Sequence, residues 1–354
     1  MEKKKKDGEY EYDFSDSRDD DDNDDKIKDP LSFMTWNLYI GADLTPILTA
    51  TTPAQIPQRV TEVFQQFLAT NFPVRVKKIA RKIASKKPDL IGLQEAELWQ
   101  LFVPGFPTVT YDFVELLLSE LRKRGLHYEV AAKNKNLLSP QLLTSHGNSV
   151  AVQDRDVILI RKGSGLKVIR RKEANFQTNL TVQIGGQQGQ IFKILRGWSY
   201  VDVETKGRIF RVINTHLEPV SPVPTSIMVQ IAQGNELLAG PANTNLPLIV
   251  LGDLNSNTDG TGTPTYQNFI NAGFRDVWIE VGKGQGFTCC QDSDLLNTVS
   301  SLSRRIDFIL FKNGWKPIRA NLLGEEQRDR TPTALWPSDH AGVVASLVLK
   351  GKPC

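Results

Sequence analysis

The chain has little of what marks several protein classes. Its 354 residues include three cysteines, Cys289, Cys290 and Cys354, and their spacing matches neither a disulfide framework nor a zinc site. We expect them to be small core or loop residues. No apolar run approaches the roughly 18 residues of a membrane helix, so we predict no transmembrane segment. The charged start lacks the apolar stretch of a secretory signal. This favours the cytoplasm, although a trimmed or replaced signal would allow secretion.

Motifs of several enzyme classes are also missing. The sequence contains no glycine-rich phosphate loop, no zinc signature and no nucleophile elbow. It has only four histidines, with 40% hydrophobic and 23% charged residues, a composition ordinary for a globular protein. The length allows one large domain or two modest ones.

Charge is distributed unevenly along the chain. Residues 1–30 contain 7 basic and 13 acidic residues, a net charge of −6, whereas the whole chain carries +3 and the remainder therefore +9. The first 30 residues bury too little apolar surface to offset the entropy of ordering. We predict a disordered charged tail over 1–30, with a cation-binding or regulatory arm as the alternative, and a catalytic domain over 31–354. A basic body suits a polyanionic substrate.

Apolar periodicity predicts more strands than helices. We expect helices over 55–70, from Pro73 to just before Pro88, over 111–124 and near 225–239; we expect the basic residues of the second helix to form a solvated face. Strands are expected at 31–40, 90–93, 127–132, 149–153, 156–161, 165–171, 180–184, 190–195, 198–204, 208–214, 248–251, 305–311, 316–322 and 341–348. Several strands adjoin without room for a crossover helix. This predicts an α/β fold of two packed, mostly antiparallel sheets with helices outside.

Short polar motifs follow the apolar strands. They are Thr35-Trp36-Asn37, Leu93-Gln94-Glu95, Asn214-Thr215-His216, Gly252-Asp253-Leu254-Asn255 and Ser338-Asp339-His340, with Asp307 interrupting a further apolar run. Residues at strand ends can converge at one rim of a sheet. Two imidazoles, several carboxylates and two amides at one rim suit a metal-assisted attack on phosphate.

Glu95 is the strongest candidate for a metal ligand. It follows a buried strand directly, where a carboxylate is costly and a hard cation such as Mg²⁺ would satisfy it. Glu97 lies two residues further on and competes for this role. Asn37 ends the first strand, where its amide can orient a carboxylate or contact phosphate or metal. The structural alternative for Glu95 is a helix cap or an ion pair, and the alternative for Asn37 is a turn asparagine.

Asp253 and Asn255 form the sharpest local pattern. Alternation along a strand sends both side chains to one face and Leu254 to the other, so the pair can position water and bind a phosphoryl oxygen; an Asx turn is the alternative. His216 ends another strand, where a neutral imidazole can exchange a proton or hydrogen-bond phosphoryl oxygen. A structural histidine is its alternative.

Asp307 interrupts an apolar strand and therefore needs a partner. His340 is the attractive one, because a buried aspartate fixes the tautomer of an imidazole and raises its basicity. A loop histidine is the alternative for His340. The remaining histidines, His127 and His146, begin a strand and lie in a loop, and we assign neither to a site.

Together and in this order, the six motifs resemble those of the endonuclease/exonuclease/phosphatase superfamily, which has the deoxyribonuclease I-like fold. The resemblance spans about residues 33–348. It implies a four-layered α/β sandwich, with the active site at one end of two packed sheets, and a metal-dependent phosphoric ester hydrolase. It also implies Mg²⁺ as the cofactor, for which we expect Mn²⁺ to be a possible substitute.

By the same resemblance, Asn37 matches the family's phosphate- and metal-site asparagine and Glu95 its Mg²⁺-binding glutamate. Asp339 resembles a metal- or phosphate-site carboxylate. The number of bound metal ions is left open by the motifs.

The other motifs match catalytic positions of the family. Asp253 and Asn255 match the pair that handles the nucleophile and the transition state. Asp307 and His340 resemble the pair that activates water, and His216 matches a second histidine found in nucleases, sphingomyelinases and some inositol phosphatases. The acidic residue that usually orients this second histidine is not identifiable in the sequence.

The substrate is less defined than the chemistry. We favour a phosphodiester over a monoester and a nuclease over a sphingomyelinase- or phosphoinositide-type lipid phosphoesterase. Nucleic acid is favoured by a basic group, Arg161, Lys162, Arg170, Arg171 and Lys172; lipid is favoured by an apolar segment, Trp99, Phe102, Val103, Pro104, Phe106 and Tyr111. A non-catalytic binding module is the alternative of another class, although such a module would lack some of the charged set. We expect a monomer by default.

Overall fold

The structure is a computed structural model that describes residues 29–350. The predicted tail over 1–30 therefore lies almost entirely outside the described residues, as does Cys354. No helix within 29–350 is long and apolar enough to span a membrane.

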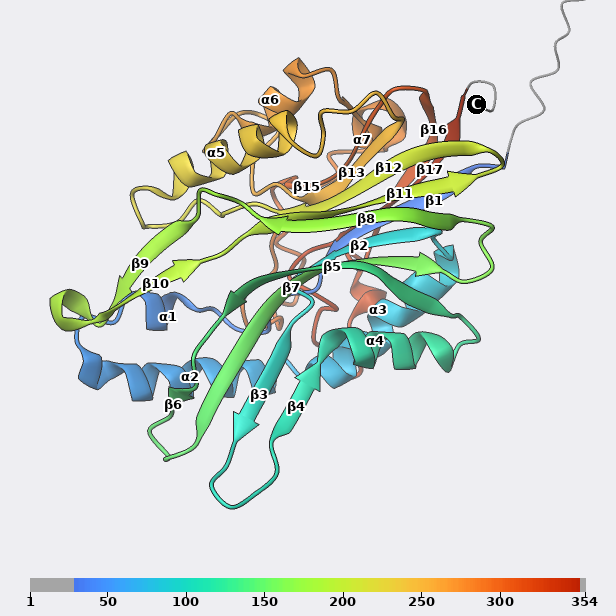
Figure 1. The fold of residues 1–354 in the computed structure, drawn as a ribbon. Helices are drawn as coiled ribbons and strands as arrows, with labels where there is room; N and C mark the ends of the chain where they lie inside the picture. The colour runs from blue at the N-terminus through green and yellow to red at the C-terminus, as the bar shows by residue number, and fades with distance from the viewer. Residues whose placement is uncertain (1–28, 351–354) are drawn as a thin grey trace, which may run out of the picture.

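Two large β-sheets form the centre of the fold (Figure 1). The larger has the order β16-β17-β1-β2-β7-β3-β4, with β5 and β6 also paired to β7, and the smaller has the order β14-β15-β13-β12-β11-β8. The larger sheet comprises β1 (Leu31–Asn37), β2 (Leu90–Gln94), β3 (Leu98–Phe102), β4 (Val109–Asp112), β5 (Tyr128–Leu138), β6 (Leu142–Leu143), β7 (Ser149–Arg161), β16 (Trp315–Leu323) and β17 (Gly342–Leu349). The smaller comprises β8 (Lys167–Asn175), β11 (Gly197–Thr205), β12 (Arg208–His216), β13 (Leu248–Asp253), β14 (Arg275–Asp276) and β15 (Asp307–Lys312). A separate hairpin pairs β9 (Leu180–Ile184) with β10 (Gln190–Ile194).

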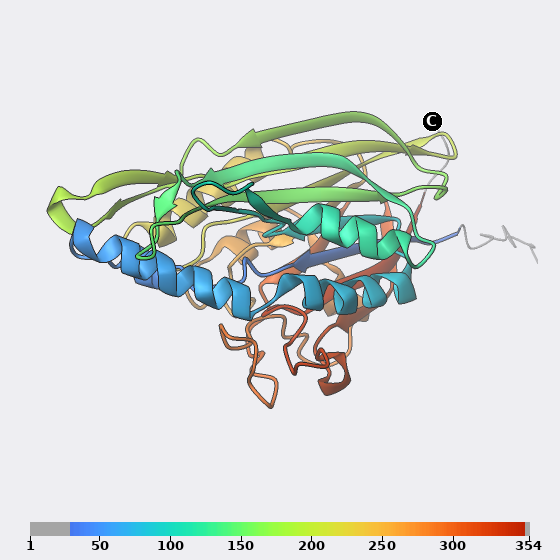
Figure 2. The ribbon, with the colours of Figure 1, turned by 90° about the horizontal axis from the view of Figure 1, so that it is seen from below.

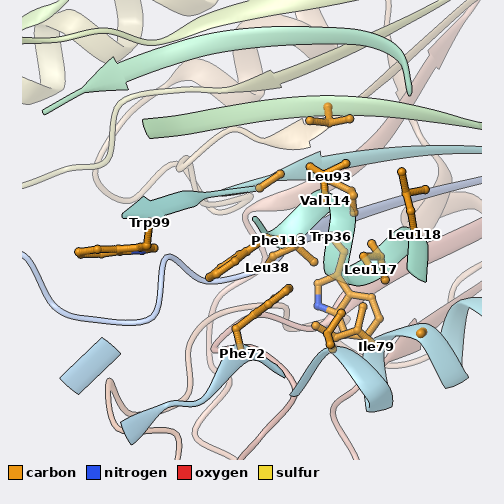
Figure 3. Close-up of a cluster of buried hydrophobic side chains, with 14 of the residues drawn as sticks. Trp36, Leu38, Phe72, Ile79, Leu93, Trp99, Phe113, Val114, Leu117 and Leu118 are labelled. Atoms are coloured by element: carbon orange, nitrogen blue, oxygen red, sulfur yellow. The ribbon is translucent and has the colours of Figure 1, made fainter. Parts of the chain in front are cut away.

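Helices cover the outer faces of both sheets, so the expected four layers are present (Figure 1), and the view from below shows the blue and green helices of one outer layer (Figure 2). The larger sheet is covered by α2 (Ile56–Ala69), α3 (Phe72–Lys86) and α4 (Phe113–Arg122), and the smaller by α5 (Ser226–Ala239) and α6 (Thr265–Asn271). Two shorter helices are α1 (Thr45–Leu48) and α7 (Val277–Val281). The amphipathic faces of α3 and α4 meet in a stack of Phe72 on Phe113, whose ring centroids lie 3.5 Å apart (Figure 3).

The four predicted helices correspond to α2, α3, α4 and α5, whereas α1, α6 and α7 have no predicted counterpart. The segment 149–161 is one continuous strand rather than two, because the charged residues at its middle are buried and paired. Arg155 donates hydrogen bonds to Asp112 and to the carbonyl of Ala96. The apolar segment after Glu95 forms a hairpin of β3 and β4, in which Trp99 is buried and Phe106 at the tip is 73% exposed.

The strand directions explain why distant motifs meet at one rim. β1 runs parallel to β2, and β12 runs parallel to β13, so the carboxyl ends of each pair lie together. The contact of Asn37 at the end of β1 with Asp253 at the end of β13 brings the two pairs to one rim. β15 is antiparallel to β13 and β17 is antiparallel to β1, which brings the starts of these later strands to that side. Asp307 opens β15, and His340 comes two residues before β17.

A buried polar contact joins the two sheets just below this rim. Gln94 donates a hydrogen bond to the amide oxygen of Asn214 at 2.7 Å, and Asn214 donates to the carbonyls of Leu93 and Val157. Gly92 permits the close approach, since a Cβ at this position would lie 2.5 Å from the Asn214 amide oxygen. We call this contact between Gln94 and Asn214 the seam. It fixes one sheet against the other just below the polar motifs.

Arg75 corrects the expectation that the basic residues of α3 all form a solvated face. Its guanidinium is fully buried and donates to the carbonyls of Thr70, Leu38 and Pro337 at 2.8, 2.9 and 2.7 Å, and to that of Tyr39 at 3.2 Å. One side chain therefore links α3 to the loop after β1 and to the segment that precedes His340.

Replacing Arg75 by Met should lower the free energy of unfolding by about 3 kcal/mol, because several buried carbonyls lose their donor. Arg81→Met is the matched control on the exposed side of the same helix, and it should change stability by less than ~0.5 kcal/mol. Urea denaturation of both variants measures the difference. Equal stabilities would show that the buried guanidinium does not hold these loops.

Candidate functional site

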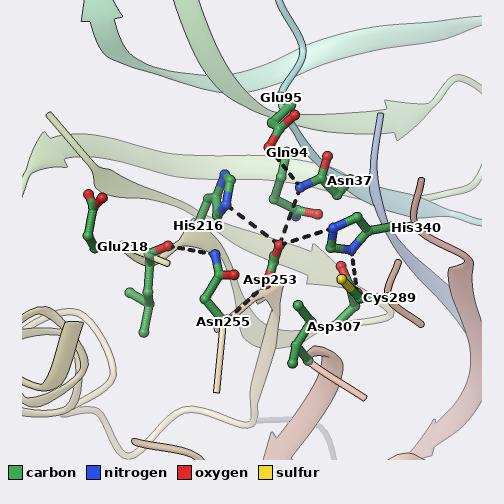
Figure 4. A network of polar contacts seen from close by, with 12 residues as sticks. Asn37, Gln94, Glu95, His216, Glu218, Asp253, Asn255, Cys289, Asp307 and His340 are labelled. Atoms are coloured by element: carbon green, nitrogen blue, oxygen red, sulfur yellow. Dashed lines mark hydrogen bonds and ion pairs between the residues drawn. The ribbon is translucent and has the colours of Figure 1, made fainter. Parts of the chain in front are cut away.

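Asp253 lies at the centre of the polar cluster (Figure 4). Its Oδ2 is 3.3 Å from Asn37 Nδ2, 3.6 Å from His216 Nε2 and 3.9 Å from His340 Nε2. Burial, followed by the charge of Asp307, raises the pKa of Asp253 to about 7. A carboxylate with this pKa can accept a proton near neutral pH.

Asp307 and His340 form the expected pair. The Asp307 Oδ2 atom lies 2.8 Å from His340 Nδ1, so Nδ1 carries a proton and the other ring nitrogen, Nε2, faces the pocket. Burial alone lowers the pKa of His340, but the negative charges of Asp307 and Asp339 outweigh it and hold this pKa well above its usual value. The indole nitrogen of Trp36 donates to the His340 carbonyl at 3.0 Å and fixes the backbone.

Glu95, Asn37 and Asp339 occupy the side of the pocket formed by the larger sheet. Asn37 Nδ2 donates to Glu95 at 3.2 Å as well as to Asp253, and its amide oxygen accepts from Tyr39 N at 2.9 Å. The backbone N–H of Ile40 donates to the second Glu95 oxygen. Asn37 therefore orients two carboxylates at once.

The donor set on this side fits a hard divalent cation. It consists of oxygen atoms, which Mg²⁺ prefers, and it carries an excess of negative charge. Burial, then the charges of Asp339 and Asp154, raise the pKa of Glu95 to about 7. The Glu95 backbone also adopts a left-handed conformation, with φ of 50°, which is uncommon for a residue with a side chain and turns the carboxylate at the end of β2. A bound cation would offset the charge that these carboxylates concentrate.

The side chain behind His216 is an arginine, not the acidic residue that the resemblance led us to expect. An Arg196 guanidinium nitrogen lies 3.0 Å from His216 Nδ1. Because arginine can only donate, Nδ1 accepts and the imidazole is neutral, with its proton on Nε2 facing Asp253. Burial, together with the positive charge of Arg196, lowers the pKa of His216 well below its usual value. The geometry fixes one tautomer of His216.

Buried carboxylates hold Arg196 in turn. Asp154 accepts from its guanidinium at 3.0 Å, and Glu218 lies 3.6 Å from its Nε. Both acids are almost completely buried, at 6% and 2% exposed. Sequence reasoning missed Arg196, because it follows β10 in an unremarkable segment and no local pattern links it to a histidine 20 residues later.

Glu97 does not share the position of Glu95. It is completely buried behind the pocket, where neither of its carboxyl oxygens accepts a hydrogen bond from a donor group. Burial, then the charges of Asp154 and Glu95, raise its pKa well above the usual value. Glu97 therefore retains a proton that an exposed glutamate would lose.

Asn255 follows Asp253 in an Asx turn, the alternative weighed for this motif. Its backbone N–H donates to Asp253 Oδ1 at 2.8 Å, and its side-chain Nδ2 donates to the Leu217 carbonyl at 2.9 Å. Leu254 points away and is completely buried. The Asx turn is therefore present, and Asn255 also lies beside Asp253 as we predicted.

The cysteine pair reaches the same pocket, which the sequence did not predict. Cys289 and Cys290 are joined as a disulfide between α7 and β15, and Cys290 Sγ is 4.0 Å from His340 Nε2. The pair is thus a part of the pocket wall. His127 and His146, which we assigned to no site, are both exposed.

All the site residues named from the sequence gather at this rim, contributed by both sheets. They are Asn37, Glu95, His216, Asp253, Asn255, Asp307, Asp339 and His340. The profile of the Endonuclease/Exonuclease/phosphatase family matches residues 34–340. The chain belongs to this family. Its members are metal-dependent phosphoester hydrolases, and this chain is one of them.

Solved structures share the fold at low sequence identity. A Beutenbergia cavernae endonuclease/exonuclease/phosphatase is 20% identical, with a TM-score of 0.54, over 92% of this chain and 72% of that one. D. rerio TDP2 complexed with a single-strand DNA product is 19% identical, with a TM-score of 0.54, over 90% and 99%. A Bacteroides thetaiotaomicron mannosyl-6-phosphatase is 16% identical, with a TM-score of 0.52, over 90% and 100%. No curated protein sequence matches the chain.

Replacing Arg196 by Gln should slow hydrolysis by roughly 10- to 100-fold, the range for a misplaced acid–base group. Without the adjacent positive charge, the pKa of His216 should also rise. The profile of the variant should therefore gain a titration that is absent from the wild-type profile, in which the fall toward acidic pH comes from protonation of Asp253. A pH–kcat profile measures this change. Lys167→Gln, at the exposed start of β8, should leave the profile unchanged, and identical profiles for all three proteins would contradict the role of Arg196.

The raised pKa of Glu97 predicts how the stability of the metal-free protein depends on pH. The native state holds a proton that the unfolded chain releases near pH 4.5, so stability falls as pH rises from there toward the native pKa. Glu97→Gln removes this loss and should stabilise the protein more at pH 8 than at pH 5. Urea denaturation in chelator at both values tests it, with the exposed Glu129→Gln as control. A gain of equal size at both pH values would contradict the prediction.

Proposed function

We propose that the protein is a Mg²⁺-dependent phosphodiesterase that acts on nucleic acid by in-line attack of water. The observation that carries this proposal is the arrangement around Asp253. His216 Nε2 and His340 Nε2 lie 3.6 and 3.9 Å from the same carboxylate oxygen, and Glu95 is linked to that oxygen through Asn37. A proton acceptor, two hydrogen-bond donors and an oxygen-rich cation site therefore face one small volume.

Each residue has a distinct role in this proposal. Asp253 takes a proton from the attacking water as the new bond to phosphorus forms and the opposite P–O bond breaks. His340, kept protonated by Asp307, donates a hydrogen bond to a phosphoryl oxygen, as does neutral His216 through Nε2–H. Asn255 places its amide beside Asp253. A divalent ion held by Glu95 and Asp339 would offset negative charge on the phosphoryl and leaving oxygens.

Nucleic acid is favoured by the charge of the body, since residues 31–354 carry +9 and a phosphodiester polymer is a polyanion. One structural neighbour, D. rerio TDP2, was solved with a single-strand DNA product. A lipid phosphoesterase is the second candidate. It is favoured by the β3–β4 hairpin, whose tip exposes 73% of Phe106 beside a strand that follows Glu95.

Hydrolysis of bis-nitrophenyl phosphate with Mg²⁺, with Mn²⁺ and with chelator tests the chemistry. The rate should require the ion, and His340→Ala should lower it by at least ~100-fold. Glu95→Gln should weaken the dependence on Mg²⁺ with little loss of melting temperature. Lys167→Gln, on an exposed strand far from the rim, is the control. If no phosphoester is hydrolysed under any condition, the chain is a binding module on this scaffold.

A panel of plasmid DNA, RNA, sphingomyelin and phosphoinositides, each with Mg²⁺ and with chelator, separates the substrates. Nicking of plasmid or cleavage of RNA supports the nuclease. Exclusive turnover of a lipid supports the second candidate, and a Phe106→Ser variant should then lose activity on vesicles but retain it on bis-nitrophenyl phosphate.

A further inference from the structure

The cysteine pair provides sulfur ligands beside a histidine that already has a carboxylate partner. We propose that Cys289, Cys290 and His340 bind one thiophilic metal ion, such as Zn²⁺ or Cd²⁺, when the two cysteines are reduced, and that an ion bound there blocks hydrolysis. Binding itself requires only these three side chains. The loss of hydrolysis rests on the function proposed above.

The positions of the three side chains suit a shared ion. One ligand atom from each lies within 4.8 Å of the others, and Cys290 Sγ is 4.0 Å from His340 Nε2. In a tetrahedral site with bonds of about 2.3 Å to sulfur and 2.0 Å to nitrogen, these two atoms are about 3.5 Å apart. A movement of a few tenths of an ångström would therefore complete the sulfur–nitrogen pair, and reduction frees the second sulfur to move.

The surroundings hold the ligands in place. Cys289 exchanges backbone hydrogen bonds with Arg304, each at 3.0 Å, and Ala341 N donates to the Thr288 carbonyl at 2.8 Å. These contacts tie the cysteine segment to the segments on both sides of it. The Arg304 guanidinium donates to both sulfurs at 3.2 Å, so it offsets negative charge on a pair of thiolates.

Asp307 supplies the support that metal-bound histidines commonly have. It accepts from His340 Nδ1 at 2.8 Å, so Nε2 is the ring atom that can bind the ion once it has released its proton. A carboxylate behind a histidine fixes the ring and raises its basicity toward a metal. The pair that orients His340 for catalysis therefore also prepares it to bind a soft ion (Figure 4).

The two cation sites differ in their ligands. The site at Glu95 and Asp339 offers oxygen atoms, which suit Mg²⁺, whereas the cysteine pair offers sulfur, which suits Zn²⁺ and Cd²⁺. We therefore expect Mg²⁺ to bind at Glu95 and Asp339, and Zn²⁺ or Cd²⁺ to bind at the cysteine pair. Hydrolysis stops because His340 Nε2, once bound to the soft ion, cannot donate to phosphate.

Reduction precedes binding and consumes a reductant. A trialkylphosphine breaks the S–S bond with one water, giving two thiols and the phosphine oxide, and the phosphorus loses the two electrons that the sulfurs gain. Each thiol then releases its proton as its sulfur binds the ion, and the His340 imidazolium releases the proton on Nε2 as this nitrogen binds. The disulfide form has no thiolate and should not bind.

Titration of the full-length protein with Cd²⁺, after phosphine reduction and anaerobic removal of the phosphine, tests the site. The ultraviolet cadmium–thiolate band should saturate at one ion per chain in the reduced protein and be absent in the oxidised protein. Cys289→Ser should lose the band, and Cys354→Ser should keep it. His340→Ala should keep the band but bind roughly 10-fold more weakly.

Activity on bis-nitrophenyl phosphate in excess Mg²⁺ is the second readout. The reduced protein should lose about 100-fold in rate when Cd²⁺ occupies the site, and Cys289→Ser should resist the same concentration. Equal inhibition of Cys289→Ser, or a reduced wild-type protein without the band, overturns the proposal. If the protein hydrolyses no ester, the proposed function fails while the absorption band still decides the metal site.

Discussion

The seam between the two sheets determines whether a site exists at all. Neither sheet holds the complete set of polar residues, since Glu95 follows a strand of the larger sheet and Asp253 ends a strand of the smaller. Asn214 reaches across the seam to Gln94 and to the Leu93 carbonyl. This contact is buried and close to the rim, where a small slip between the sheets would separate the carboxylates. The close approach at Gly92 makes the seam tight enough to fix them.

The sequence could predict the convergence of the motifs, because each one follows or opens an apolar strand and strand ends meet at a sheet edge. It also predicted the partnership of Asp307 with His340, since a carboxylate inside an apolar strand needs a partner. Contacts that depend on tertiary packing could not be found in this way. Arg75 has the same local pattern as the solvated cations of its helix, and only the carbonyls of distant loops distinguish it. The predicted break between strands 149–153 and 156–161 is wrong for the same reason, because the partner of Arg155 lies 43 residues away.

Arg196 changes the electrostatics of the second histidine. A carboxylate behind His216 would favour the imidazolium, whereas the guanidinium at 3.0 Å favours the neutral ring. The carboxylates of Asp154 and Glu218 contact the Arg196 guanidinium and not the ring of His216. The two imidazoles of the pocket therefore differ in charge: His340 is held positive and His216 neutral. A site with one charged and one uncharged donor can stabilise phosphoryl oxygens without placing two positive rings against each other.

The return of β17 to pair with β1 has a consequence for biosynthesis. The first and last strands of the described chain are hydrogen-bonded neighbours, so the larger sheet stays open along β1 until residues 342–349 have left the ribosome. Asp339 and His340 emerge just before them. Until then the β1 edge presents unpaired backbone groups, and the pocket lacks two of its residues.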